Sequence, residues 1–162
     1  HMQPVITELF DRLKKTGFRV IIGVSGHNVQ SMIDMINNAM EPVLTDGECA
    51  GVGLWEMSLS LCDDSSSDHA GKWETSNIMF LHPELVDMDT LGTEPITLDM
   101  SPPHGIGGLD PREHASAEVG RLNIQLCSEA LGIKARELLQ SLPVEKRDFN
   151  IDKIEPGSWW MV

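Results

Sequence analysis

The sequence predicts an α/β fold, because a helix, a buried strand and a second helix follow one another in its first third. Over residues 4–15, apolar side chains recur every four positions, as they do on the buried face of a helix. Residues 18–24 read FRVIIGV, a short β-branched run next to glycine that is typical of a strand covered on both faces. Methionine and isoleucine then return to helical spacing over residues 32–40. This succession is typical of a layered α/β arrangement.

The middle of the chain continues the alternation of strands and helices. Residues 50–59 predict a second strand, and residues 72–82 predict a helix. A stretch rich in proline and glycine, 87–110, predicts a long loop with only a short possible strand at 96–98. Loops of this length usually serve function or an interface.

The last predicted helix, 111–142, is the longest in the chain. Its apolar residues recur at steps of three and four. Only Gly120 and Gly132 interrupt the pattern, and each costs about 1 kcal/mol relative to alanine in a helix. On this basis the two glycines are equivalent.

The length predicts a single domain over residues 1–162, with the loop at 87–110 inside it. A chain of 162 residues can bury roughly 70% of its unfolded surface around one core. The sequence contains no internal repeat and no linker that would separate two cores. Its 41% of hydrophobic residues and 23% of charged residues are ordinary values for a globular protein.

Charge and composition exclude several classes of partner. Lysine plus arginine number 12 and aspartate plus glutamate 25, which gives a net charge of −13. The negative electrostatic potential of such a chain repels phosphate backbones and anionic lipids, so we expect no nucleic acid and no membrane partner. The first residues do not resemble a secretion signal, and the cysteines are odd in number and lack C-x-x-C spacing, so we predict a cytoplasmic protein. These cysteines are Cys49, Cys62 and Cys127.

Four polar side chains stand at predicted loops or helix starts, where the ligand sites of open α/β sheets lie. His27 follows the first predicted strand, and Asp68, His69 and Glu74 surround the start of the helix at 72–82. Imidazole nitrogen and carboxylate oxygen are ligands for zinc, so His27, Glu74 and His69 could contribute to a metal site. The spacing leaves a second interpretation open, in which His27 caps a helix start and His69 forms hydrogen bonds in a loop.

Other catalytic chemistry fits the sequence less well. Ser25 lies on a strand-to-helix turn, but His27 stands where a nucleophile elbow requires glycine. An apolar helix surrounds Cys127 and acidic residues follow Cys62, so neither thiol is expected to act as a nucleophile. His104 could reach a site from the long loop, in its own subunit or in a neighbouring one.

Three segments in a fixed order carry a resemblance to a known enzyme family. The first is a strand that ends in S-G-H-N, the second reads D-H-A-G-K-W-E-T-S and is followed by H-P-E-L-V, and the third is a glycine-rich segment that ends in D-P. They resemble the N-G-H-G-G-N strand end, the H-A-G-x-x-E-T-S block and the glycine-rich D-P segment of the creatininase, or creatinine amidohydrolase, family. The segments are residues 17–28, 68–76 with 82–86, and 107–111 with Ala115, Glu118 and Gly120.

This resemblance implies a three-layer α/β/α fold with a mostly parallel sheet, hydrolysis of amides, cyclic amides or formamides, and a hexamer. It also implies a two-metal centre that holds zinc, manganese or iron. By position, His27 and Glu74 resemble the family's metal ligands, and His69 resembles the histidine that contacts the substrate and assists proton transfer. The residues predicted to contact the substrate are Asn28, Trp55 and Asp68.

The resemblance covers only the carboxyl-terminal portion of the family. Members begin with further strands that carry E-x-H and a metal-bridging aspartate, and we expect these strands and ligands to be missing from this chain. Val29 also replaces a glycine of the family motif.

Two hypotheses for the function follow. In one, the chain is part of a metal-dependent amidohydrolase whose remaining ligands come from a second polypeptide or were lost by truncation. In the other, it is a non-catalytic creatininase-like subunit, or binding module, that has lost its metal site. In both, an exposed sheet edge predicts self-association or a partner.

Overall fold

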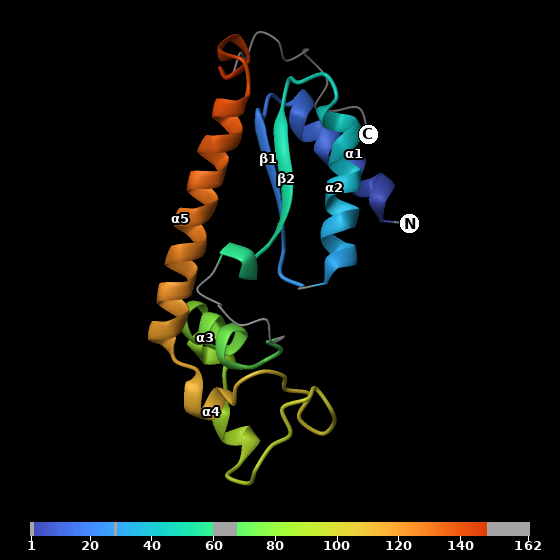
Figure 1. The fold of residues 1–162 in the computed structure, drawn as a ribbon. Coiled ribbons are helices and arrows are strands. Elements are labelled where there is room, and N and C mark those ends of the chain that lie inside the picture. The colour runs from blue at the N-terminus through green and yellow to red at the C-terminus, as the bar shows by residue number, and fades with distance from the viewer. Residues whose placement is uncertain (1, 28, 60–67, 149–162) are drawn as a thin grey trace. The chain divides into compact units, whose positions relative to one another are not determined.

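The computed structural model describes residues 2–27, 29–59 and 68–148 (Figure 1). By its internal contacts the chain divides into two compact units, formed by His1–Glu56 with Leu131–Val162 and by Met57–Ala130. The helices and the small parallel sheet confirm the predicted α/β class, and the single domain stays a prediction. Within the described ranges, no helix is both long and apolar enough to cross a lipid bilayer.

Two parallel strands form the sheet of the first unit. Strand β1 (Val20–Ser25) pairs with β2 (Ala50–Trp55) along its whole length. Helix α2 (Gln30–Leu44) connects them, because parallel neighbours need a crossover that returns the chain to the starting edge. Helix α1 (Gln3–Lys15) precedes β1, in agreement with the first predicted helix. The parallel pairing predicted for the sheet is therefore confirmed.

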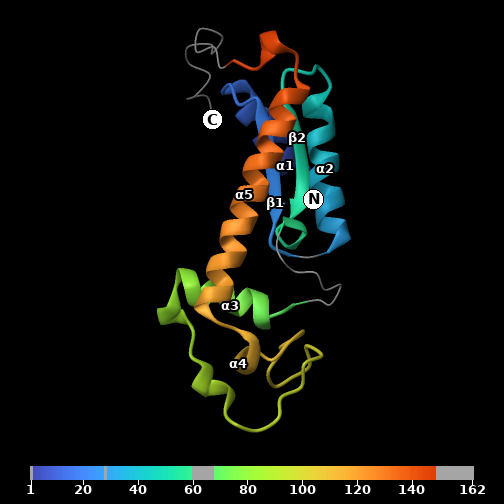
Figure 2. The ribbon, with the colours of Figure 1, turned by 60° about the vertical axis from the view of Figure 1, so that its left-hand side comes forward.

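The core of the first unit lies where α1 and α2 pack together and against the strands (Figures 1 and 2). A Cβ atom added to Gly53 of β2 would lie 2.7 Å from Cγ2 of Ile36 in α2, so only glycine permits this close approach. Burying an aliphatic or aromatic side chain contributes about 1.5–3 kcal/mol relative to exposure. The buried residues are Phe10, Ile21, Ile33, Ile36, Ala39, Met40, Val43 and Cys49.

In the second unit, helix α3 (Lys72–Leu81) crosses the first part of helix α5 (Ala117–Ser141) at very close range. A Cβ atom added to Gly120 would lie only 1.9 Å from the carbonyl oxygen of Ser76. Ser76 is fully buried, and its hydroxyl accepts a hydrogen bond from the Ser116 N–H over 3.1 Å. This crossing fixes α3, whose first turn carries Glu74, with Asp68 and His69 just before the helix.

Two predicted strands differ from the structure. Strand β2 ends at Trp55 and a 3₁₀ turn follows over Met57–Leu59, so the strand predicted over 50–59 is too long. Residues 96–98 form no strand. The backbone pairing in this part of the chain begins just after them, with a bridge between Asp99 and Gly107. The short strand predicted from the apolar residues at 96–98 is therefore wrong.

The helix predicted over 111–142 is interrupted near its start. A short helix α4 (Pro111–His114) ends at Ala115, which is extended with ψ of 144°, and α5 begins two residues later. The Ser116 N–H bonds to the side chain of Ser76 instead of continuing the helical pattern. A tertiary contact therefore causes the break, and the local sequence does not reveal it.

Candidate functional site

Asp68 fixes the start of helix α3. Its Oδ2 accepts a hydrogen bond from the Glu74 N–H over 2.8 Å, and its Oδ1 accepts one from the Trp73 N–H over 3.3 Å. These N–H groups have no partner within the helix itself. Asp68 is only 9% exposed, and burial is the main cause that raises the pKa of its carboxyl above the ordinary value of 3.8. The structure thus gives Asp68 a capping role, and its contact with substrate stays a prediction.

Glu74 folds back over the same turn. Its Oε2 accepts a hydrogen bond from the Ala70 N–H over 2.8 Å, while the Thr75 hydroxyl donates to the Ala70 carbonyl over 2.9 Å. Asp68 therefore binds backbone N–H groups of the first helical turn, and Glu74 binds one that lies just before the helix. This arrangement leaves Glu74 Oε2 4.0 Å from Nδ1 of His69, with the two side chains 45% and 59% exposed. The structure brings these two predicted site residues together.

Backbone pairing attaches His69 to the long loop at 87–110. The His69 N–H donates to the Gly107 carbonyl over 3.0 Å, and the Gly107 N–H donates to the His69 carbonyl over 2.8 Å. Gly107 also forms a bridge with Asp99 on its other side. The loop and the histidine therefore belong to one structural element, which the turn-rich composition does not reveal.

Arg112 binds the long loop at 87–110 at a second place. Its Nη2 donates to Oδ2 of Asp110 over 2.7 Å, and its Nη1 donates to the carbonyl groups of Gly92 and Glu94 over 2.8 and 2.9 Å. The hydrogen bond from the Arg112 side chain is the main cause that lowers the pKa of Asp110 below 3.8. Arginine–carboxylate pairs of this kind combine charge with fixed geometry, so they hold the loop against the start of α4.

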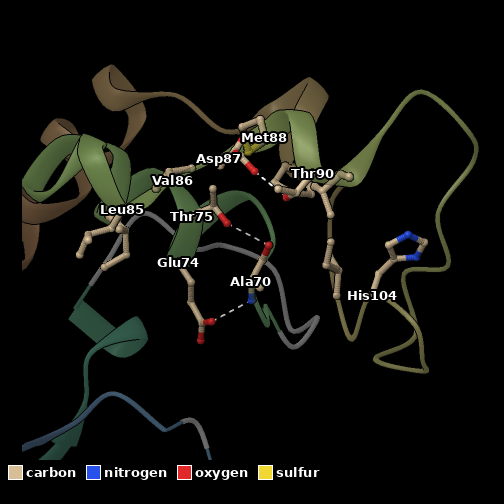
Figure 3. Close-up of a pocket in the computed structure, with 13 residues that line it drawn as sticks. Ala70, Glu74, Thr75, Leu85, Val86, Asp87, Met88, Thr90 and His104 are labelled. Carbon is tan, nitrogen blue, oxygen red and sulfur yellow. Dashed lines mark hydrogen bonds between the residues drawn. The ribbon is translucent and has the colours of Figure 1, made fainter.

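A pocket of about 380 Å³ lies beside α3 (Figure 3). Ala70, Glu74 and Thr75 line it from the helix start, and His104 lines it from the long loop. Nδ1 of His104 is buried and has no hydrogen-bond partner in the described part of the chain. The sequence indicated only that His104 could reach a site, and the structure places it in the pocket that Glu74 lines. His69 is not among the lining residues.

His27 lies in the first unit, directly after β1, and is exposed. Its N–H donates to the Ser25 hydroxyl oxygen over 3.2 Å, and that hydroxyl donates to the His27 carbonyl over 3.0 Å. Trp55 at the end of β2 donates from Nε1 to the Val29 carbonyl over 3.3 Å, so it lies next to the segment that follows His27. Asn28 lies outside the described residues. The roles predicted for these residues stay predictions.

The donor types expected for a metal are present, but they form no complete site. In residues 2–27, 29–59 and 68–148, no three histidine, cysteine, aspartate or glutamate side chains gather at a spacing that could hold a metal ion. His69 and Glu74 are neighbours, and two groups fall short of the three or four protein ligands of a zinc site. The Cys62 thiol lies outside the described residues. The ligand set that these residues offer is therefore incomplete.

The fold and the site together define an α/β protein with acid–base side chains grouped at a helix start. Comparison with protein families goes further, because the sequence model of the creatininase family, described as creatinine amidohydrolase, matches residues 1–132. The chain belongs to the creatininase family, which confirms the resemblance found in its motifs. No curated protein sequence gives a significant match.

A solved structure supports the same fold. The chain is similar to a mutant creatininase complexed with creatine, with 22% sequence identity and a TM-score of 0.58. The match covers 84% of this chain and 63% of that chain, so this chain spans less than two thirds of the creatininase that it resembles.

Proposed function

We propose that this chain contributes His69 and Glu74 to an amidohydrolase site, which hydrolyses the C–N bond of an amide, a cyclic amide or a formamide. The observation that supports the proposal most directly is the 4.0 Å separation between His69 Nδ1 and Glu74 Oε2. Both residues stand in the segment that resembles the family's H-A-G-x-x-E-T-S block. An imidazole beside a carboxylate can hold a proton and pass it on.

The proposed reaction needs a proton at the departing nitrogen. Water adds to the carbonyl carbon, the C–N bond breaks, and its electron pair leaves with the nitrogen, which must then be protonated. We assign this proton to His69, whose side chain is 59% exposed and therefore accessible to a substrate. Overall, water supplies a hydroxyl group to the acyl carbon and a hydrogen to the nitrogen.

We also propose that the site works with a divalent metal ion, which is zinc, manganese or iron. His27 and Glu74 are the proposed ligands from this chain. Elemental analysis of the purified chain, together with any protein that copurifies, tests this. About two equivalents of metal are expected for a two-metal site. No bound metal after incubation with excess divalent ions would contradict this part of the proposal.

The complete site is proposed to form in an assembly in the cytoplasm. The assembly is either a homo-oligomer, a hexamer by family resemblance, or a complex with a second chain that supplies the remaining ligands. Light scattering of the purified protein checks it, and a stable monomer would contradict it.

The test of the function compares two exposed histidines on either side of α3. His69→Ala should lower the rate of amide hydrolysis by about 10²- to 10⁴-fold, because removal of a general acid has effects of this size. His82 is a matched control, since its side chain is 61% exposed and its Nδ1 also faces a glutamate, at 3.2 Å. His82→Ala should keep hydrolysis within about twofold, as expected for a surface site that does not touch substrate.

Two results would overturn the proposal. One is equal activity of the His69→Ala variant and the unmodified chain. The other is inactivity of a fully metal-loaded assembly toward a panel of amides and formamides. That second result would favour the alternative of a non-catalytic binding subunit, for which His27→Ala should leave partner binding intact.

A further inference from the structure

Hydrocarbon side chains form most of the wall of the pocket beside α3. They come from the helix itself, from the segment 85–91 that follows it, and from the loop that carries His104 (Figure 3). The volume of about 380 Å³ is typical of small-molecule sites, which occupy about 300–1,000 Å³. The larger apolar side chains of the lining are Ile78, Leu85, Val86, Met88, Leu91 and Ile106.

Most of the polar side chains in the pocket are already bonded within the protein. The hydroxyls of Thr75 and Thr90 donate to backbone carbonyl groups over 2.9 and 2.7 Å. The Asp87 carboxylate accepts a backbone N–H over 3.1 Å. Nδ1 of His104 differs from these groups, because it is buried and has no partner among the described residues. Because this atom has no accessible surface while the pocket is empty, the apolar wall is the feature that a ligand in the pocket contacts.

We propose that this pocket receives an apolar substituent of the substrate, so that the substrates are uncharged amides that carry a hydrocarbon group of about phenyl size. The amide chemistry in this inference rests on the proposed function. The inference adds to that function the class of amide that the site accepts. Glu74 lines the pocket and lies beside His69, so a group bound there sits next to the proposed proton donor.

The charges around the pocket exclude anionic substituents. Glu74 and Asp87 are acidic, and the described lining residues include no lysine or arginine. A carboxylate placed here would meet like charges and an apolar wall, which oppose its desolvation. The inference therefore distinguishes three probes: N-benzylformamide, which is apolar and uncharged, formamide, which lacks the substituent, and N-formylglycine, which carries a carboxylate.

To test the substrate class, each of the three probes is titrated into the full chain. Binding is monitored through the NMR chemical shifts of the backbone amides. N-benzylformamide should bind at least about tenfold more tightly than the other two, because only it buries hydrocarbon surface. The shifts should centre on residues 85–91 and on His104. Equal affinities for the three probes, or shifts elsewhere in the chain, would overturn the inference.

Two positions on α3 provide a matched pair of variants. Ile78 lines the pocket and is 40% exposed, whereas Leu81 on the same helix is 49% exposed and does not line it. Ile78→Asp should weaken N-benzylformamide binding at least about tenfold, because it places a carboxylate in the apolar wall. Leu81→Asp should leave binding unchanged, and circular dichroism checks that both variants are folded. Equal effects of the two variants would count against the pocket.

Failure of this inference is distinguishable from failure of the proposed function. If hydrolysis depends on His69 but shows no preference for apolar amides, the inference is wrong and the proposed function stands. If N-benzylformamide binds in the pocket but a metal-loaded assembly hydrolyses no amide, the proposed function is wrong and the apolar selectivity of the pocket is supported.

Discussion

At the scale of single residues, two carboxylates at the start of α3 show how geometry separates roles that look alike in the sequence. Asp68 is buried and binds two backbone N–H groups, so it stabilises the helix start. Glu74 is 45% exposed and lies 4.0 Å from His69. The motif identifies both as polar residues near a site, and only their burial and partners distinguish the buried cap from the exposed carboxylate beside His69.

The capping role of Asp68 predicts a stability difference between two substitutions. Asp68→Ala should lower the free energy of unfolding by about 1 kcal/mol, the usual effect of removing a helix cap. Asp68→Asn keeps an acceptor oxygen for the Glu74 N–H, so its effect should be less than about half as large. Urea denaturation measures both. Equal losses for the two variants would show that the carboxylate does not act as a cap.

The pH dependence of the same pair checks the charge of Asp68. Because burial raises its pKa above 3.8, the folded chain holds this proton more tightly than the unfolded chain. The contribution of Asp68 to the free energy of unfolding is therefore greatest below this value and falls as the pH rises through the raised pKa. Relative to Asp68→Asn, the unmodified chain should lose stability as the pH rises from below 3.8 through the raised pKa. A relative gain over this range would contradict the assignment.

At the scale of elements, helix α5 contains two glycines, Gly120 and Gly132, to which helix propensity assigns the same cost. Gly120 lies at the crossing with α3, where an added Cβ atom would be 1.9 Å from a backbone oxygen. At Gly132 an added Cβ atom would lie 3.6 Å from Nη1 of Arg136, which is ordinary van der Waals contact. Helix propensity alone assigns both the same cost, because it contains no information about the neighbouring helix.

The two glycines therefore predict opposite effects of the same substitution. Gly132→Ala should raise the free energy of unfolding by about 0.5–1 kcal/mol, because alanine is the better helix former. Gly120→Ala should lower it by about 2 kcal/mol or more, because the backbone of α3 has to move to make room. Thermal melts followed by circular dichroism measure both changes. Stabilisation by Gly120→Ala would mean that α3 and α5 do not cross as described.

At the scale of the whole molecule, local patterns predict the elements, and contacts between distant segments determine the site. The βαβ arrangement of β1, α2 and β2 and the grouping of His69 with Glu74 follow from periodicity and from a motif within one short stretch. The pairing of His69 with Gly107, far along the chain, has no such signal. For that reason the sequence could not place His104 in the pocket, nor predict the break before α5.

The net charge of −13 makes a prediction for the whole chain. Repulsion between like charges destabilises the compact state, and salt weakens it. Raising the concentration of KCl from about 10 to about 150 mM shortens the screening length from about 30 to about 8 Å. Screening also weakens surface ion pairs, but each of them contributes only about 0–1 kcal/mol to the free energy of unfolding. The reduced repulsion between acidic side chains should therefore have the larger effect on stability. We expect the Tm to rise by about 2–4 °C. Choline chloride at equal ionic strength should give the same rise, since screening does not depend on the identity of the cation. A lower Tm at higher salt would show that paired charges, not the excess of acidic residues, control the stability of this fold.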